Sequence, residues 1–459
     1  MAEALENNWR PRGLAALVAA ALVGGALPVC AQTAATTTDA AASQPAAPAV
    51  WAVHVQATDV FQYHPSFNSP FAGPNSLRGA AALNNTLAAS FFVGVRPWRG
   101  GQLWVDIDMN QGFAPSNTLG VAGYVNGEGA KVGHKSAYFR PQRAFFRQTI
   151  ELGGGDDSVD PGLFEFGGKT TRDRLVLTVG KFGATDVFDA NAYAHDPTAD
   201  FLNWALIDTG TWDYAADAWG FSVGGAAEWY TGSWTLRAGL FNLSKVPNSE
   251  ALEYDFSQYQ TQFEVEKRFS FRGHPGAAKV TSFVTRGRMA RFDDAIRLAE
   301  QTGQTPNVAQ VRRYATRPGV SLDVQQELAG DLGVFLRAGV ADGDHEPYEY
   351  ADIDQTVAGG VALKGSRWGR ARDVVGAALM VNGISRIHQR YLADGGLGIL
   401  VGDGKLPHPG PEAIIETYYN WAVFGPATLS FDYQLVVNPA YNRDRGPASV
   451  LGLRVHAQY

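Results

Sequence analysis

The sequence contains a single cysteine, Cys30, close to its N-terminus. Residues 1–31 combine two arginines, an apolar run and a small-residue cleavage site ending at Ala31, which is the pattern of a secretory signal peptide. Residues 27–30 resemble a lipoprotein box, but Val29 occupies a position that requires Gly or Ala, so cleavage after Ala31 is favoured. The mature chain then has no cysteine, which excludes disulfides, thiolate metal sites and a cysteine nucleophile.

Long apolar runs are also lacking, since no stretch beyond Gln32 is long enough for a transmembrane helix. Helix-forming runs of Leu, Ala and Lys are scarce, whereas the 52 glycines and 12% aromatic residues favour strands and turns. The net charge of −7 argues against nucleic acid as a partner. Residues 32–50 have almost no large apolar side chain and cannot bury a core, which predicts a flexible N-terminal arm.

The C-terminal stretch 450–459 alternates strictly between two kinds of side chain. Its apolar residues are Leu451, Leu453, Val455, Ala457 and Tyr459, and those between them are Gly452, Arg454, His456 and Gln458. A period of two predicts a strand with one apolar and one wet face. The final residue is aromatic, as in the strand that closes a bacterial outer-membrane barrel.

Similar alternating segments recur from Trp51 onward, about sixteen in all. A β-sandwich also alternates, but it has about seven to nine strands per domain, and no linker divides this chain. A porin-sized barrel turns apolar residues to lipid and polar ones to water, with strands of roughly nine to eleven residues, as here. We therefore predict an all-β fold over residues 51–459, a transmembrane antiparallel β-barrel of about 16 strands with inward-folded loops.

Short and long connections alternate between these segments. The short breaks are centred on Gly or Pro, at 99–101, 230–233, 272–277, 329–331 and 425–426, and the long ones are 112–137, 182–219, 292–316 and 384–411. Porins arrange periplasmic turns and outer loops in this way. Helical spacing of apolar residues predicts a short helix over 292–303, and we expect the loop 112–137 to fold inward and narrow the pore.

Several stretches from about Tyr63 to Tyr459 resemble the OprB family of carbohydrate-selective porins. They are Asn117–Gly123, Phe145–Thr149, Asp196-Pro197, Asp200–Trp204, Tyr391–Ala393, Gly395–Gly398, Gly402–Gly404, Asn438-Pro439, Tyr441-Asn442 and Arg445–Pro447. No single piece is specific, but their order along one exported chain is. The resemblance implies a sixteen-stranded barrel in a Gram-negative outer membrane, through which carbohydrates such as glucose-like sugars diffuse passively into the periplasm. It implies neither cofactor nor catalysis, and it leaves monomer and homotrimer open.

A channel for neutral sugars needs planar hydrogen-bonding groups and aromatic platforms rather than one strong field of charge. Side chains alternate between the two faces of a strand, and this strand parity points Trp104, Asp106, Asp108 and Asn110 into the lumen. On the next strand Arg143 and Arg147 share a face, so we expect both to approach the two aspartates, with Trp104 as a stacking surface. Further polar-face candidates for binding or constriction are Arg237, Glu264 and Glu416. The alternative for each residue is an ordinary luminal charge facing bulk water.

Other functions stay open at this point. A porin for an organic acid or another anion would favour a ladder of Lys and Arg, whereas these candidates mix both signs. A barrel enzyme would need a nucleophile and a base near the rim, and no such pair is found. A plugged structural barrel is a third possibility. The run Gly153–Asp157 with Asp160 could bind calcium, but a solvated loop is favoured because the spacing fits no calcium loop.

Overall fold

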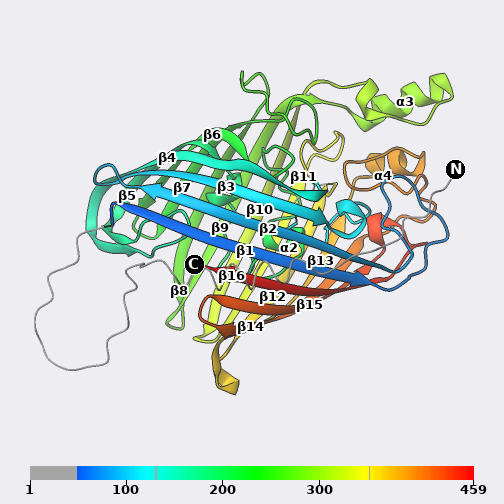
Figure 1. The fold of residues 1–459 in the computed structure, drawn as a ribbon. Coiled ribbons are helices and arrows are strands. Elements are labelled where there is room, and N and C mark those ends of the chain that lie inside the picture. Colours follow the sequence, from blue (N-terminus) through cyan, green and yellow to red (C-terminus); the bar gives the residue numbers. More distant parts are fainter. Residues whose placement is uncertain (1–48, 130–131, 351) are drawn as a thin grey trace, which may run out of the picture.

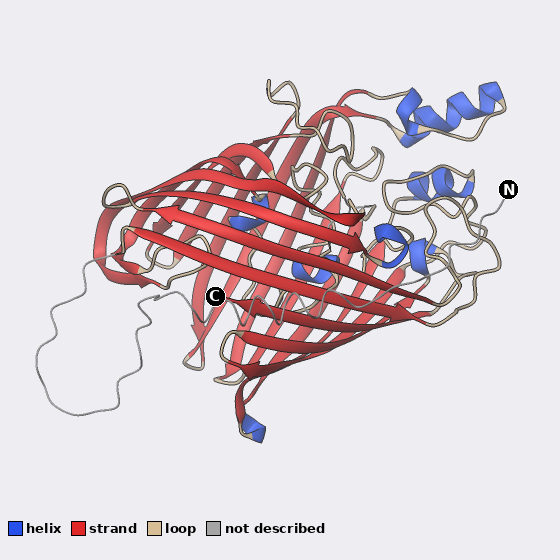
Figure 2. Ribbon diagram, viewed as in Figure 1, coloured by secondary structure: helices blue, strands red, loops and turns tan. Residues whose placement is uncertain are grey.

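The computed structural model describes residues 49–129, 132–350 and 352–459. Within these residues sixteen antiparallel strands form one closed barrel, in which each strand pairs with its neighbours in sequence and β16 pairs with β1 (Figures 1 and 2). The predicted fold class is thereby confirmed. The predicted signal peptide, residues 1–31, and most of the predicted arm, residues 32–50, lie outside the described residues.

The bounds of the strands and helices are as follows. The strands are β1 (Trp51–His64), β2 (Ala82–Val95), β3 (Gly101–Phe113), β4 (His134–Val159), β5 (Gly168–Phe182), β6 (Ser222–Thr231), β7 (Trp234–Asn242), β8 (Tyr259–Phe271), β9 (His274–Met289), β10 (Arg313–Ala329), β11 (Leu332–Ala341), β12 (Gln355–Gly365), β13 (Arg370–Gly383), β14 (Glu412–Phe424), β15 (Ala427–Val437) and β16 (Ala448–Gln458). The helices are α2 (Trp204–Ile207), α3 (Phe292–Thr302) and α4 (Arg386–Ala393). The predicted helix over 292–303 is α3, which stands beyond the strand ends, outside the barrel (Figure 2).

The last strand closes the sheet against the first, as its alternation predicts. The register runs from Gln56 opposite Gln458 to Tyr63 opposite Leu451. Val55 and Tyr459 exchange both of their backbone hydrogen bonds, at 2.9 and 2.8 Å. Closure leaves no free sheet edge, which is what a lipid environment requires of a β-structure.

The two faces of the sheet have opposite polarity. Apolar side chains such as Val105, Val265 and Phe431 are exposed on the outer surface. The polar stripe that the sequence shows on β8 faces inward, with Gln260 and Glu264 fully buried. Among the described residues no helix is long and apolar enough to cross a membrane.

Short and long connections separate to opposite ends of the barrel. The predicted short breaks correspond to the links β2–β3, β6–β7, β8–β9, β10–β11 and β14–β15. The start of β1 and the end of β16 lie at this same end, because the strands alternate in direction. Since porins have short periplasmic turns, this end is periplasmic and the long loops are extracellular. The link β4–β5 also lies at the periplasmic end but is longer, with residues 160–167 between the strands.

Val265 tests the assignment of the outer face to lipid, because it is exposed at the centre of β8. We expect Val265→Arg to lower the free energy of unfolding by about 2–4 kcal/mol, since the charge would lie near the bilayer midplane. Phe271→Arg, at the periplasmic end of the same strand, should cost only about 0–1 kcal/mol. Urea titration of the protein in lipid vesicles measures both. Equal costs for the two variants would contradict the membrane placement.

Candidate functional site

The barrel interior is occupied by two long loops. The β3–β4 loop, residues 114–133, folds inward as expected: Val121 and Ala122 are buried, and Glu412 of β14 accepts hydrogen bonds from the amides of Ala122 and Gly123 at 3.0 and 2.8 Å. The β5–β6 loop, residues 183–221, is the larger insertion, and its residues 201–218 are buried throughout. Its length is visible in the sequence, but its position inside the lumen was not predicted.

Glu416 on β14 holds the β5–β6 loop to one side of the barrel. Its carboxylate accepts hydrogen bonds from the backbone amides of Leu202 and Asn203, at 2.5 and 3.0 Å. The Asn203 side chain continues the attachment by donating to Gln434 of β15 at 3.0 Å. Strand parity correctly points Glu416 into the lumen. Its hydrogen bonds are with the loop, so it holds the loop in place rather than facing open space.

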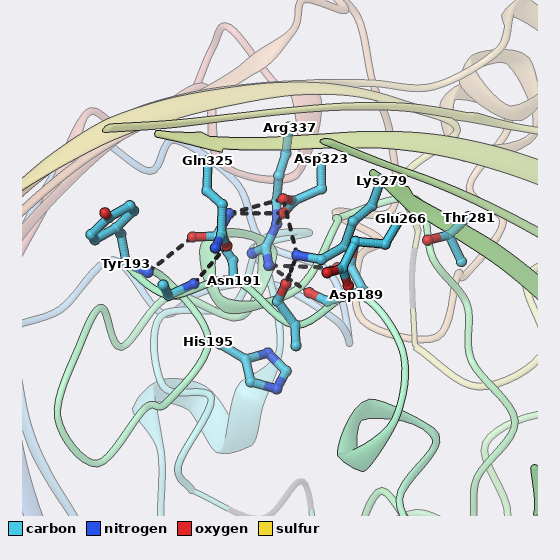
Figure 3. A network of polar contacts seen from close by, with 12 residues as sticks. Asp189, Asn191, Tyr193, His195, Glu266, Lys279, Thr281, Asp323, Gln325 and Arg337 are labelled. Carbon is cyan, nitrogen blue, oxygen red and sulfur yellow. Dashed lines mark hydrogen bonds and ion pairs between the residues drawn. The ribbon is translucent and has the colours of Figure 1, made fainter. Parts of the chain in front are cut away.

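A buried ionic network holds the same loop to β10 and β11 (Figure 3). Arg337 on β11 donates through Nε to the Asp323 carboxylate of β10 at 2.7 Å, and through Nη2 to the Asp189 carbonyl at 2.9 Å. Its Nη1 donates to the Leu206 carbonyl. Asn191 of the loop donates to both carboxylate oxygens of Asp323 at 3.0 Å. The loop is therefore fixed by charges that water does not reach.

Arg237 and Glu264 belong to a second ionic cluster next to this network. Arg237 on β7 pairs with Glu264 and Glu266 of β8 at 2.6 and 2.8 Å, and with Glu228 of β6 at 3.1 Å. Glu264 in addition accepts a hydrogen bond from the backbone amide of Asp189 at 2.8 Å. Both predicted residues face inward, as the alternation along the strands requires. Arg237 joins β7 to β6 and β8, and Glu264 joins β8 to the β5–β6 loop.

Besides a cavity of about 500 Å³ between the β5–β6 loop and strands β8–β13, open space follows the side of the barrel formed by β1–β4. It is a cavity of about 480 Å³ between these strands and the two loops. Among the predicted residues Asp108, Asn110 and Arg143 line it. Aromatic side chains from the β5–β6 loop, including Trp219 and Phe221, cover its other side.

Arg143 is the most highly connected charge at this cavity. Its Nη1 donates to Asp106 at 2.9 Å, which is the predicted pairing, and its Nε and Nη2 donate to both oxygens of Asp186 at 2.9 and 2.8 Å. The rings of Phe164 and Phe221 contact the guanidinium, with centroids 4.8 and 4.7 Å from Cζ. Parity could predict Asp106 but not Asp186, Phe164 or Phe221, because these three lie in connections between strands.

The expectation that Arg147 approaches the two aspartates is wrong. The register places Arg147 opposite Gln102, whereas Asp106 lies opposite Arg143. Residues four apart on a strand are about 13 Å apart, so sharing a face does not bring both arginines to one site. Arg147 instead pairs with Glu165 of the β4–β5 turn at 2.6 Å.

Trp104 faces inward as predicted, but it cannot serve as a stacking surface for a sugar. Only 1% of its surface is exposed. Its ring packs against Phe166 of the β4–β5 turn at a centroid distance of 4.9 Å, and its Nε1 donates to Gln102 at 3.0 Å. Phe166 lies in a connection between strands, so periodicity could not predict its inward position.

Two ionisable loop residues also line the cavity. His195 lies 3.5 Å from Asp208. Burial alone favours a neutral imidazole, but the hydrogen bond and charge of Asp208 outweigh it and raise the pKa of His195 to about 9. Burial, with the charge of Asp196 adding to it, raises the pKa of Glu128 to about 8. At neutral pH the imidazole is therefore protonated and the Glu128 carboxyl is largely neutral.

The comparisons with known proteins agree with this architecture. The sequence model of the OprB family, described as a carbohydrate-selective porin, matches residues 94–459. The high-pH structure of Pseudomonas putida OprB superposes with a TM-score of 0.67 at 14% identity, covering 89% of this chain and 94% of that chain. The outer membrane channel DcaP of Acinetobacter baumannii gives 0.51 at 10% identity, covering 89% and 97%. No curated protein matches the chain.

The two titrating residues predict a pH-dependent ion preference. As pH rises from about 7 to about 10, Glu128 gains a negative charge and His195 loses its positive one. The permeability to Cl⁻ relative to K⁺ should therefore fall, as measured by reversal potentials in a KCl gradient. The double variant Glu128→Gln/His195→Gln should lose most of this fall, whereas His408→Gln, on an exposed loop, should retain it. A full fall in the double variant would contradict the assignment.

Arg337→Met tests the attachment of the β5–β6 loop. It removes the guanidinium that faces the buried Asp323 and Asp189 and leaves only Lys279, 3.6 Å from Asp323; breaking a buried pair in this way costs up to about 3–5 kcal/mol. We expect lower thermal stability and a larger, noisier single-channel conductance as the loop loosens. Arg313→Met removes an exposed pairing with Asp294 and should change neither property. A quiet channel of parental conductance would show that Arg337 does not hold the loop.

Proposed function

The chain belongs to the OprB family of carbohydrate-selective porins, and on this premise we propose that glucose-like sugars cross along the cavity beside β1–β4. The protein is a channel of the Gram-negative outer membrane through which carbohydrates enter the periplasm. The proposal concerns the route and the residues that select the solute. We propose that Arg143, Asp106, Asp108 and Asn110 form the constriction on this route, together with Asp186.

The main support for this route is the set of charged and aromatic side chains around Arg143. Asp106 and Asp186 both pair with its guanidinium, so the site has hydrogen-bonding groups of both signs and no excess of positive charge. Phe164 and Phe221 add apolar ring faces beside it. A sugar carries hydroxyls on its rim and is mildly apolar on its faces, so it matches this combination better than an anion does.

Catalysis forms no part of the proposal. The ionic groups of the lumen are engaged in joining strands to loops, as Arg337 and Glu416 illustrate. A porin for organic acids remains the rival, and a strong preference of the channel for anions over sugars would favour it. One chain encloses the complete passage, so we propose that each barrel conducts by itself, whether the porin is a monomer or a homotrimer.

Asn110→Ala tests the constriction because Asn110 lines the cavity and is only partly buried. Loss of one hydrogen bond to the solute, worth about 0.5–1.5 kcal/mol, should raise the glucose concentration that half-blocks the KCl current by about two- to tenfold. Thr302→Ala, at the exposed end of α3, should leave it unchanged. Planar-bilayer recordings with increasing glucose measure this. Equal half-block in both variants would remove Asn110 from the site, and a parent channel insensitive to all sugars would refute the proposed function.

A further inference from the structure

The periplasmic link between β4 and β5 differs from the other short turns. The link β8–β9 consists of residues 272–273 alone, whereas β4 continues for 26 residues and residues 160–167 follow it. Gly153, Gly154 and Gly155 all have positive φ, at 100°, 77° and 92°, and the register with β5 shifts twice around them. Residues other than glycine rarely adopt this backbone conformation, so the three glycines allow the hairpin to bend (Figure 1).

The end of the bent hairpin, residues 160–167, is attached inside the periplasmic mouth; we call it the β4–β5 tip. Glu165 pairs with Arg147 at 2.6 Å and accepts a hydrogen bond from the Gln102 side chain at 2.5 Å. Gln102 in turn accepts from the backbone amide of Phe166 at 3.2 Å. Phe166 is buried against Trp104. The tip is thus held by an ion pair, side-chain hydrogen bonds and an aromatic contact.

This attachment places the side chains of Leu163 and Phe164 at the cavity beside β1–β4, which is the proposed conduction route. Leu163 and Phe164 line the same cavity as Asp108, Asn110 and Arg143, and both are partly exposed there. The Phe164 ring lies 6.2 Å from that of Phe92 on β2, and it contacts the guanidinium of Arg143. Phe164 therefore borders the cavity on its periplasmic side.

We propose that the β4–β5 tip is the periplasmic constriction of this channel and that Phe164 is a specificity-determining residue at the exit. Its ring offers an apolar face to a sugar that leaves Arg143 for the periplasm. The sugar contact rests on the proposed function. The narrowing of the conduction route by the tip does not, because it holds for any solute.

If the β4–β5 tip served only to cover Trp104, it would need Phe166 and its neighbours but no side chain that reaches the cavity. The side chains of Glu165 and Phe166 and the backbone carbonyl of Phe164, which accepts from Arg147 at 3.1 Å, attach the tip to the barrel. The side chains of Leu163 and Phe164 leave part of their surface open to the cavity. This division separates anchoring residues from residues that meet the solute. Substitution at Phe164 can therefore test the route without removing the anchors.

The first experiment places a single cysteine at the tip, which is possible because the predicted mature chain has none. A bulky, positively charged methanethiosulfonate reagent added to Phe164→Cys should lower the KCl conductance at least twofold. Lys169→Cys, exposed on β5 outside the tip, should react without a change in conductance. An unchanged conductance after complete modification of Phe164→Cys, verified by mass spectrometry, would overturn the constriction.

The second experiment separates the size of the exit from recognition of the sugar. Phe164→Ala should raise the KCl conductance and raise the half-blocking glucose concentration at least twofold, whereas Phe164→Tyr, which keeps a ring, should restore both. Parental values of both quantities in Phe164→Ala would overturn the proposal. If the KCl conductance rises in a channel that no sugar blocks even in the parent, the proposed function fails while the constriction stands.

Discussion

In lipid every backbone N–H and C=O must find its partner within the protein, and the rest of this structure depends on that requirement. The sheet can meet it only by closing, which β16 does against β1. Closure by sixteen strands encloses a lumen wider than side chains alone can fill. The long loops must therefore supply the structure inside the barrel, and the position of the passage is decided by where these loops attach.

The attachments are largely ionic because the inner face of the barrel is polar. Carboxylates such as Glu416 accept hydrogen bonds from backbone amides of the β5–β6 loop, and Arg337 donates hydrogen bonds to its carbonyls. Polar groups of the loop that lose their contact with water therefore gain charged partners. Buried charges that make such contacts are occupied and contribute little field to the passage. At the cavity, Arg143 is itself paired with Asp106 and Asp186, so it adds no unbalanced positive charge to the passage.

Alternation alone predicts the closed barrel, the last strand against the first and the inward direction of residues such as Asp106 and Glu264. The direction of a side chain depends only on its own position in the alternation, so parity predicts it correctly for each residue. Contacts along a strand also depend on register, so the pairing of Arg143 with Asp106 is confirmed while that of Arg147 is wrong. Asp186 and Phe164 lie in connections, whose path is set by tertiary contacts that no periodicity encodes.

Arg143 is the point at which structures from both ends of the barrel meet. Phe221 reaches it from the β5–β6 loop on the extracellular side, and Phe164 reaches it from the β4–β5 turn on the periplasmic side. A rigid guanidinium held by Asp106 and Asp186 keeps its planar faces toward these two rings. One side chain thereby contacts two connections that start from opposite ends of the barrel. In the proposed channel, selectivity depends on how both connections are anchored as much as on the residues that a solute touches.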